Sequence, residues 1–428
     1  MVHPESSLTS FDNENLDRLA ATVPAWRGEQ MRAAYRVFDA LSEPTGTEED
    51  WRYVEFGMPF AGLGPVFEPG TPLAPGPFLS AVGDASGKVV IVDGHVVSID
   101  SDEVSVSRIG EMDEDPGLRG SVPPDHNKLA AAHAAFATDG IVIDVPANQV
   151  FASPLVIDIQ AVTPDSATFP HVVIRVGPNA EASVLVVYRS APGVSLLMIP
   201  EVDLTLGDGA RLRYLSVQGL DHAGTIVVHQ RTHLGRDSTS RVGEVGLGAG
   251  LGRLDVGVDL TGDGSSSEIV GLYFGEADQT LDYRMVINHQ GKRTSSDVFL
   301  KGAVEDNAQS VFTGLLRIEK NATRTSTFET NRNLVLSENA KAQSVPNLEI
   351  LCDDVICGHA SSVGPLEGDH LYYLQSRGLP KERAERLLIR GFFQEVIDRL
   401  PIKSIEEPIS DEVFSRFVTA QKEGRVAS

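Results

Sequence analysis

The chain has 428 residues, is 41% hydrophobic and 22% charged, and carries a formal net charge of −24. This length exceeds that of one compact core, so we expect two or three structural regions. The negative charge disfavours binding to nucleic acid or to anionic membranes, and the sequence shows neither a membrane-spanning stretch nor an N-terminal secretory signal.

The N-terminal region, residues 1–125, is predicted to be helical with one β-hairpin. Aromatic and aliphatic residues at helical spacing predict a helix over 25–41. Within 88–100, two valine-rich runs flank the dipeptide Asp93-Gly94. This dipeptide favours a type I′ hairpin turn, because both turn residues need a positive φ.

The predicted core, residues 126–364, opens with a short helix and continues as β structure. The helix fits 125–138, with Asp125 as its N-cap. Short strands then alternate with turns such as GPNA, GDGA, GRDS and GDGS, which begin at positions 177, 207, 235 and 262. Spacings in this range are typical of a solenoid, and the lack of long helices favours a β-helix. An antiparallel sandwich or barrel fits the same pattern.

Two motifs in the core resemble ligand sites. The glycine-rich run at 246–253 precedes a strand-like segment rather than a helix, so we interpret it as a crowded turn and not as a dinucleotide loop. On a strand, His229 and His233 would lie about 13 Å apart, too far to share a metal ion, and are interpreted as surface residues. The sequence contains no P-loop, so the chain is not expected to hydrolyse ATP.

The C-terminal region, residues 365–428, is predicted to be helical. One short helix covers 369–377 and ends at Gly378. A second helix begins at Pro380, and Ser410 is the expected N-cap of the last one.

The second of these helices carries an apolar stripe with two adjacent phenylalanines. Only one of the two can face the core of the chain, so the other is a candidate contact for a partner protein. The predicted partner-binding residues are Leu388, Phe392, Phe393 and Val396.

The segment 345–364 contains Cys352 and Cys357, both cysteines of the chain, and His359. Two cysteines cannot form a disulfide framework, so a cytoplasmic location is expected. Strand alternation places Cys357 and His359 on one face and Cys352 on the other, unless a bulge intervenes. A thiolate and an imidazole can bind iron or zinc, but further ligands would have to come from another chain, sulfide or a small molecule. We favour a functional role for His359 and a buried, structural role for Cys352.

This segment resembles the SufD family. The run LEILCDDVICGHASSVG at 348–364, followed by YLQSRG at 373–378, is similar to the C-terminal hallmark of SufD proteins. PTGTEEDWRYVEF at 44–56 and HAAFATDGIVIDVPANQV at 133–150 resemble the N-terminal element and the start of the core. The resemblance covers nearly the whole chain and is most specific in its last third.

The resemblance implies a mainly β protein: a right-handed parallel β-helix flanked by α-helical N- and C-terminal regions. It also implies a non-enzymatic scaffold subunit for iron–sulfur cluster assembly. Such a subunit pairs with the paralogue SufB and binds the ATPase SufC through its C-terminal helices. It holds no tightly bound cofactor, and a transient iron–sulfur cluster forms near the SufB–SufD interface.

The resemblance also assigns residues. The interface histidine of the family corresponds to His359 and the neighbouring cysteine to Cys357. Ile350 stands near the position of the cysteine that receives sulfur in SufB, which favours SufD over SufB. One departure is Ala360, which replaces the usual glycine after the histidine and should only restrict the turn slightly.

A second class of function stays open, because a β-helix could also be a carbohydrate-active enzyme such as a polysaccharide lyase. That activity needs acidic and basic groups gathered in a cleft, and the sequence does not identify such a set. Co-purification of an ATPase subunit would favour the scaffold, and cleavage of a sugar polymer by the isolated chain would favour the enzyme.

Overall fold

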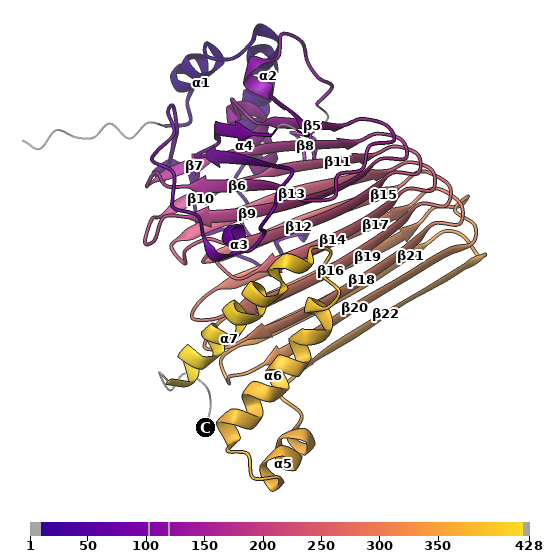
Figure 1. Ribbon diagram of the computed structural model, residues 1–428. Helices are drawn as coiled ribbons and strands as arrows, with labels where there is room; N and C mark the ends of the chain where they lie inside the picture. Colours follow the sequence, from indigo (N-terminus) through magenta and orange to yellow (C-terminus); the bar gives the residue numbers. More distant parts are fainter. Residues whose placement is uncertain (1–9, 102, 119, 423–428) are drawn as a thin grey trace, which may run out of the picture.

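The computed structural model describes residues 10–101, 103–118 and 120–422. Two sheets of mostly parallel strands are joined into a flattened β-helix, with helices at both ends (Figure 1). The predicted fold class is confirmed, and the antiparallel sandwich is excluded. No helix in the described ranges is long and apolar enough to cross a membrane. Residues 1–9, where a secretory signal was considered, lie outside the described ranges.

Sheet A is a 12-stranded sheet, and three of its strands are short and lie off the main path. Along the main path its strands are β4 (Ser105–Arg108), β5 (Ile141–Val145), β8 (His171–Val176), β11 (Glu201–Leu206), β13 (Gly224–Leu234), β15 (Leu251–Leu260), β17 (Thr280–His289), β19 (Gln309–Ile318) and β21 (Lys341–Ile350). The short strands are β1 (Gly64–Pro65), β7 (Ser166–Thr168) and β10 (Leu196–Met198).

Sheet B is a 10-stranded sheet that alternates with sheet A along the chain. In spatial order its strands are β3 (His95–Asp100), β2 (Gly87–Val92), β6 (Leu155–Ala161), β9 (Glu181–Ser190), β12 (Arg211–Gly219), β14 (Thr239–Gly246), β16 (Ser266–Gly275), β18 (Ser295–Val304), β20 (Thr325–Val335) and β22 (Val355–Gly364).

Side chains along each strand alternate between the interior of the β-helix and an outer face. Aliphatic residues such as Val202 and Leu204 of β11 point inward and join one continuous core between the sheets. Most of the N-terminal helices cover part of the outer face of sheet A, and the C-terminal helices cover part of sheet B (Figure 1).

The repeated turns form one corner of the β-helix. Their third residues, among them Asn179, Gly209, Asp237 and Gly264, have φ values of 56°, 69°, 52° and 76°. Each of these four residues donates its N–H to a carbonyl oxygen in the corresponding turn of the next coil. Glycine, asparagine and aspartate tolerate this backbone conformation, which explains the repeat in the sequence.

Two local predictions about turns are confirmed. Asp93 and Gly94 join β2 to β3 with φ values of 51° and 85°, and β2 also pairs in parallel with β6. The glycine-rich run turns from β14 into β15, as expected of a crowded turn. A Cβ atom on Gly248 would lie 2.2 Å from the carbonyl oxygen of Leu220, so a larger residue does not fit there.

The N-terminal helices are α1 (Asn13–Ala20), α2 (Ala25–Ala40), α3 (Pro77–Ser80) and α4 (Lys128–Phe136), with 3-10 turns η1 (Glu49–Trp51), η2 (Phe60–Gly62) and η3 (Ile109–Glu111). The predicted N-cap Asp125 is wrong. Asn127 caps α4, because its side chain accepts the N–H of Ala130 at 2.8 Å. The domain boundaries expected at 125 and 364 stay predictions.

The C-terminal helices are α5 (Gly368–Ser376), α6 (Lys381–Ile397) and α7 (Glu406–Lys422), with the 3-10 turn η4 (Lys403–Ile405) before α7. The predicted break at Gly378 is confirmed by its φ of 89°. The N-cap expected at Ser410 is wrong, since α7 begins at Glu406. Pro408 lies in the first turn of α7, where its missing N–H costs no helical hydrogen bond.

Candidate functional site at the open end of the β-helix

The last coil of the β-helix ends in two strands, each with one unpaired edge. Among the described residues, β21 pairs with β19, and β22 pairs with β20. Each of these two strands is 10 residues long, and most of their side chains are exposed or half-buried. Long unpaired strands readily accept another strand, so proteins normally cover or interrupt them.

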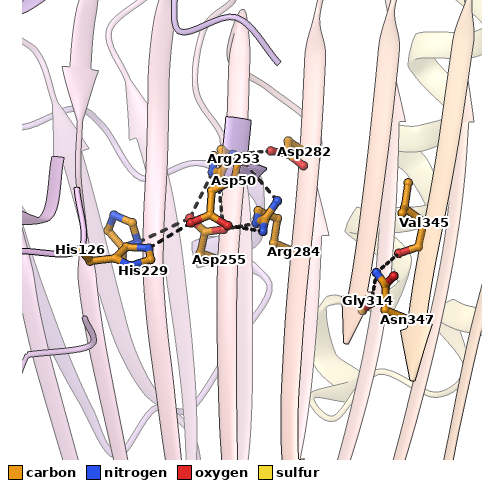
Figure 2. A network of polar contacts seen from close by, with 10 residues as sticks. All are labelled: Asp50, His126, His229, Arg253, Asp255, Asp282, Arg284, Gly314, Val345 and Asn347. Carbon is orange, nitrogen blue, oxygen red and sulfur yellow. Dashed lines mark hydrogen bonds and ion pairs between the residues drawn. The ribbon is translucent and has the colours of Figure 1, made fainter. Parts of the chain in front are cut away.

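The edge strand β21 is held in place by its own polar contacts. The side chain of Asn347 donates to the carbonyl oxygens of Gly314 and Val345, both at 3.1 Å (right of Figure 2). The strand is therefore anchored to β19 at its middle, although nothing in the described part of the chain pairs with its other edge.

The predicted site residues Cys357 and His359 lie on β22, at the open end. In the register of β20 and β22 they stand beside Thr327 and Glu329, which are buried in the interior. Cys357 and His359 therefore face the interior of the β-helix, where no further coil covers them. Cys357 is half-buried and His359 is exposed. The expectation that both side chains share one face is confirmed.

Cys352 lies in the corner between β21 and β22. It is 8% exposed and packs with Ile318 and Ala322, and Cys357 touches the same cluster. This position agrees with a structural role for Cys352, and the role itself stays a prediction.

Glu329 was not singled out from the sequence. It is 2% exposed, and within the described ranges neither carboxylate oxygen has a hydrogen-bond partner. Gly314 makes room for it, since a Cβ atom there would lie 2.0 Å from the Glu329 carboxylate. Burial raises the pKa of Glu329 to about 8, so this carboxyl can hold a proton near neutral pH beside His359. The signal in the sequence was a carboxylate at an inward position of a strand.

The structure separates the predicted partner contacts on α6 into two buried and two half-buried residues. Phe393 and Val396 are buried against the outer face of sheet B, so they stabilise this chain and present no surface to a partner. Phe392 is half-buried, with the ammonium of Lys301 4.6 Å from the centre of its ring. Leu388 is also half-buried. A role in partner binding stays a prediction for Phe392 and Leu388.

A second polar cluster lies on β13, β15 and β17, where the N-terminal region covers sheet A (Figure 2). Arg253 is its centre: it contacts Asp255 at 3.1 Å and Asp282 at 2.7 Å, and it donates to the backbone carbonyl of Asp50 at 2.7 Å. The ring of Trp51 lies 4.1 Å from its guanidinium. These contacts fix the N-terminal Trp-Arg-Tyr element onto the β-helix.

The same cluster corrects one interpretation of the sequence. His229 is 1% exposed, not a surface residue, and its Nδ1 lies 3.6 Å from Asp255. Burial lowers the pKa of His229 to about 4, so the ring is neutral at physiological pH. Asp50 is held by Arg284 at 2.6 Å and by His126 at 3.6 Å. The arginines and aspartates of the cluster pair with one another, and the cluster has the character of a structural clamp.

Comparison with known proteins places this architecture in a family. The family described as "SUF system FeS cluster assembly, SufBD core domain" matches residues 159–392. An iron–sulfur cluster assembly SufBD family protein of Mycobacterium leprae is 32% identical over 380 residues, which is 86% of this chain and 89% of that protein.

Two similar proteins are named as iron–sulfur cluster assembly protein SufD. The Bacillus subtilis protein is 33% identical over 306 residues, 68% of this chain and 67% of that protein. The Escherichia coli protein is 24% identical over 391 residues, 87% of this chain and 89% of that protein. The chain therefore belongs to the SufBD family and has a role in iron–sulfur cluster assembly, with its likeness to SufD as expected from the motifs of its last third.

Proposed function

We propose that this chain is a scaffold subunit that pairs with a SufB-type paralogue, binds a SufC-type ATPase, and contributes residues to a nascent iron–sulfur cluster where the two paralogues meet. The observation that carries the proposal is the open end of the β-helix. Two long strands leave their edges unpaired there, and a cysteine and a histidine face inward between them.

The unpaired backbone groups at the edges of β21 and β22 support the proposed pairing with a second subunit. A paralogue with the same fold would offer two edge strands of its own, and hydrogen bonds between edges would extend both sheets across the interface. Apolar side chains lie beside these edges, among them Ile356, Val363 and Leu348, which are 65%, 45% and 39% exposed. Burying them in the interface would add a hydrophobic contribution to the backbone hydrogen bonds.

The proposed iron–sulfur cluster site at this interface uses groups that face the interior of the β-helix. Cys357 supplies a thiol and His359 an imidazole, and both are ligands for iron. The buried carboxyl of Glu329, the neighbour of His359 on β20, would take up or release protons as ligands exchange. Two ligands do not complete a cluster site, so the remaining ones would come from the paralogue or from sulfide.

The ATPase surface is proposed on α5 and on the exposed side of α6. None of the α5 residues is buried, and Tyr372 and Tyr373 are 74% and 55% exposed. Leu387 on α6 is 51% exposed and lines a groove of about 750 Å³ together with Leu388 and Phe392. Exposed aromatic residues near a groove that has apolar side chains in its lining are typical of a protein-binding surface.

The pairing proposal can be tested with prolines in β22. Proline removes one backbone N–H, and along a strand successive N–H groups point to opposite edges. Of Ala360→Pro and Ser361→Pro, one therefore removes a hydrogen bond to β20, and the other removes an N–H on the free edge. The variant that loses an N–H on the free edge should melt at the same temperature as the parent chain, and it should no longer co-purify with the paralogue.

Two outcomes would contradict this proposal. One is undiminished co-purification of the paralogue with both proline variants. The other is normal pairing by every variant that still folds, which would place the interface away from β22.

A further inference from the structure

Two histidines and a glutamate meet between the N-terminal helix α4 and two neighbouring strands of sheet A. His133 lies on α4, and His171 and Glu201 are the first residues of the neighbouring strands β8 and β11, paired with each other in the register of the sheet. All three side chains are buried, at 1%, 4% and 3% exposed. One ligand atom from each lies within 4.8 Å of the others.

The hydrogen bonds on the outer sides of the two rings determine where their protons lie. Nδ1 of His133 lies 2.8 Å from the carbonyl oxygen of Ile199, which can only accept, so Nδ1 carries the proton. Nε2 of His171 lies 3.3 Å from a carboxylate oxygen of Asp203 and donates to it in the same way.

The remaining nitrogens, Nε2 of His133 and Nδ1 of His171, face each other at 3.2 Å. When both rings are neutral, each of these nitrogens presents a lone pair, and two lone pairs at this distance repel. A cation between the two nitrogens would relieve this repulsion and use both lone pairs as ligands.

Glu201 is placed to complete a cation site. Its Oε2 lies 3.9 Å from Nε2 of His133 and accepts the N–H of Ser121 at 3.2 Å. A carboxylate oxygen at this position can serve as the third ligand of a cation held by the two imidazoles.

We propose that His133, His171 and Glu201 bind a divalent transition-metal ion of the Fe²⁺ or Zn²⁺ class. Two imidazole nitrogens that share such an ion lie about 3.3 Å apart, because each metal–nitrogen bond is about 2.0–2.1 Å. The separation of 3.2 Å fits this arrangement without movement of the rings. Two histidines and one carboxylate form a ligand set that suits either metal.

The surroundings of the three ligands support the assignment. Both rings have an outer hydrogen bond of the kind that orients metal-binding histidines. The three side chains line a cavity of about 450 Å³, which leaves space for water or an exchanging ligand in the open coordination positions. The cluster is distinct from the open end, since Cys357 and His359 lie on the last strand of sheet B.

One positive group faces the cluster. Arg27 on α2 is buried beside the cavity, but its guanidinium donates to the carbonyl oxygen of Ala137 at 2.8 Å and to Gln30 at 3.3 Å. The carboxylates of Glu201 and Asp203 offset Arg27 and one charge of the ion. A divalent ion therefore leaves this buried region with about one net positive charge, which a bound hydroxide or another anion in the cavity would neutralise.

The test measures metal binding by the full chain, stripped of metal, in a background that carries Cys357→Ser and His359→Ala. This background removes the proposed cluster ligands, so the result is independent of the proposed function. Zn²⁺ is titrated against a chromophoric chelator, and Fe²⁺ is titrated without air. We expect one tight site per chain for Zn²⁺, and a weaker one for Fe²⁺ at the same position.

Glu201→Gln keeps the shape of the side chain and an acceptor for the Ser121 N–H, and it should weaken Zn²⁺ binding by at least about 100-fold, as loss of a metal ligand does. Glu244→Gln is the matched control, because Glu244 is also buried and hydrogen-bonded but lies in the interior of the β-helix. It should leave the affinity unchanged.

Asp203→Asn provides a second variant if Glu201→Gln does not fold. It changes the outer partner of His171, which also accepts the Ser121 hydroxyl, and should weaken binding by about 10–100-fold. The proposal is overturned if the parent chain shows no tight site, or if folded Glu201→Gln and Asp203→Asn bind Zn²⁺ as tightly as Glu244→Gln.

Discussion

The two ends of the β-helix finish in opposite ways. At the N-terminal end, the strands β3 and β4 are short and antiparallel to their neighbours, and helices and a cluster of aromatic rings cover the adjoining surface. At the C-terminal end, β21 and β22 run for 10 residues each, and no strand of the described chain pairs with their outer edges, which exposed aliphatic side chains accompany.

This difference indicates that the two ends of one continuous fold have different roles. The closed end satisfies its own backbone and charged groups, so its substitutions should change the stability of the isolated chain. The open end leaves hydrogen bonds and apolar surface for a partner, so its substitutions should change assembly and leave stability nearly unaltered. The following predictions compare the two ends from the largest expected effect to the smallest.

The largest effect is expected from Arg253→Ala on β15, in the part of sheet A that the N-terminal region covers. The substitution leaves Asp282 buried without its cation and removes the contact with Trp51, which should lower the free energy of unfolding by about 3–5 kcal/mol. Denaturant unfolding of the isolated chain measures this loss. The matched control is Arg241→Ala, whose ion pair with Glu268 is largely exposed and should contribute less than about 1 kcal/mol. Equal losses for both variants would contradict the assignment of Arg253 as a structural clamp.

A smaller effect, confined to assembly, is expected for Tyr372→Ala combined with Tyr373→Ala. Both rings are exposed, so the melting temperature should stay the same, whereas binding of the ATPase subunit should weaken by about 2 kcal/mol or more if the rings are central contacts. Calorimetric titration of the ATPase subunit measures the change. Unchanged affinity would place the ATPase surface elsewhere.

His359→Ala should separate function from stability at the open end. His359 is exposed in the isolated chain, so its loss should not change the melting temperature. Cluster formation on the assembled complex should fall by about tenfold or more, because an iron ligand or proton carrier is missing. Visible absorbance after reconstitution measures the yield. Cys352→Ala is the control: it should retain cluster formation and lower stability by about 1 kcal/mol, since it removes a small buried group. Full cluster yield from His359→Ala would refute the role of this residue.

The smallest effect is a pH dependence at Glu329. Its pKa in the folded chain is raised to about 8, against an ordinary value of 4.5, so the folded state binds more protons between these pH values. Stability due to this group therefore falls as pH rises from 4.5 to 8. Glu329→Gln removes this titration, so it should match the parent near pH 5 and melt about 2–5 °C higher at pH 8. A difference between the two chains that stays constant with pH would show that Glu329 is ionised in the folded state.

The sequence predicted the regular parts of the molecule because their signals are local. Turn residues such as Asn179 and Asp237 mark one corner of the β-helix, since few residue types tolerate a positive φ. The motif of the last strand placed Cys357 and His359 on one face by alternation alone. The resemblance to a family then resolved the choice between a β-helix and a sandwich, which periodicity had left open.

What the sequence did not predict depends on contacts between distant segments. Burial of His229 arises because the N-terminal region covers sheet A, and no local pattern encodes that cover. The choice of Phe393 over Phe392 as the buried ring depends on how α6 lies on sheet B. The cluster of His133, His171 and Glu201 joins one helix to two strands, so spacing along the chain gave no signal for it.

The central claim is that the open end, and not the closed end, is completed by a partner subunit. Hydrogen–deuterium exchange, compared between the isolated chain and its complex with the SufB-type paralogue, tests it most directly. The account predicts that amides of β21 and β22 exchange rapidly in the isolated chain and become protected in the complex, while amides of β5, β8 and α4 are protected equally in both. Protection that appears at the N-terminal end instead, or no change at β21 and β22 in a complex that has formed, would contradict it.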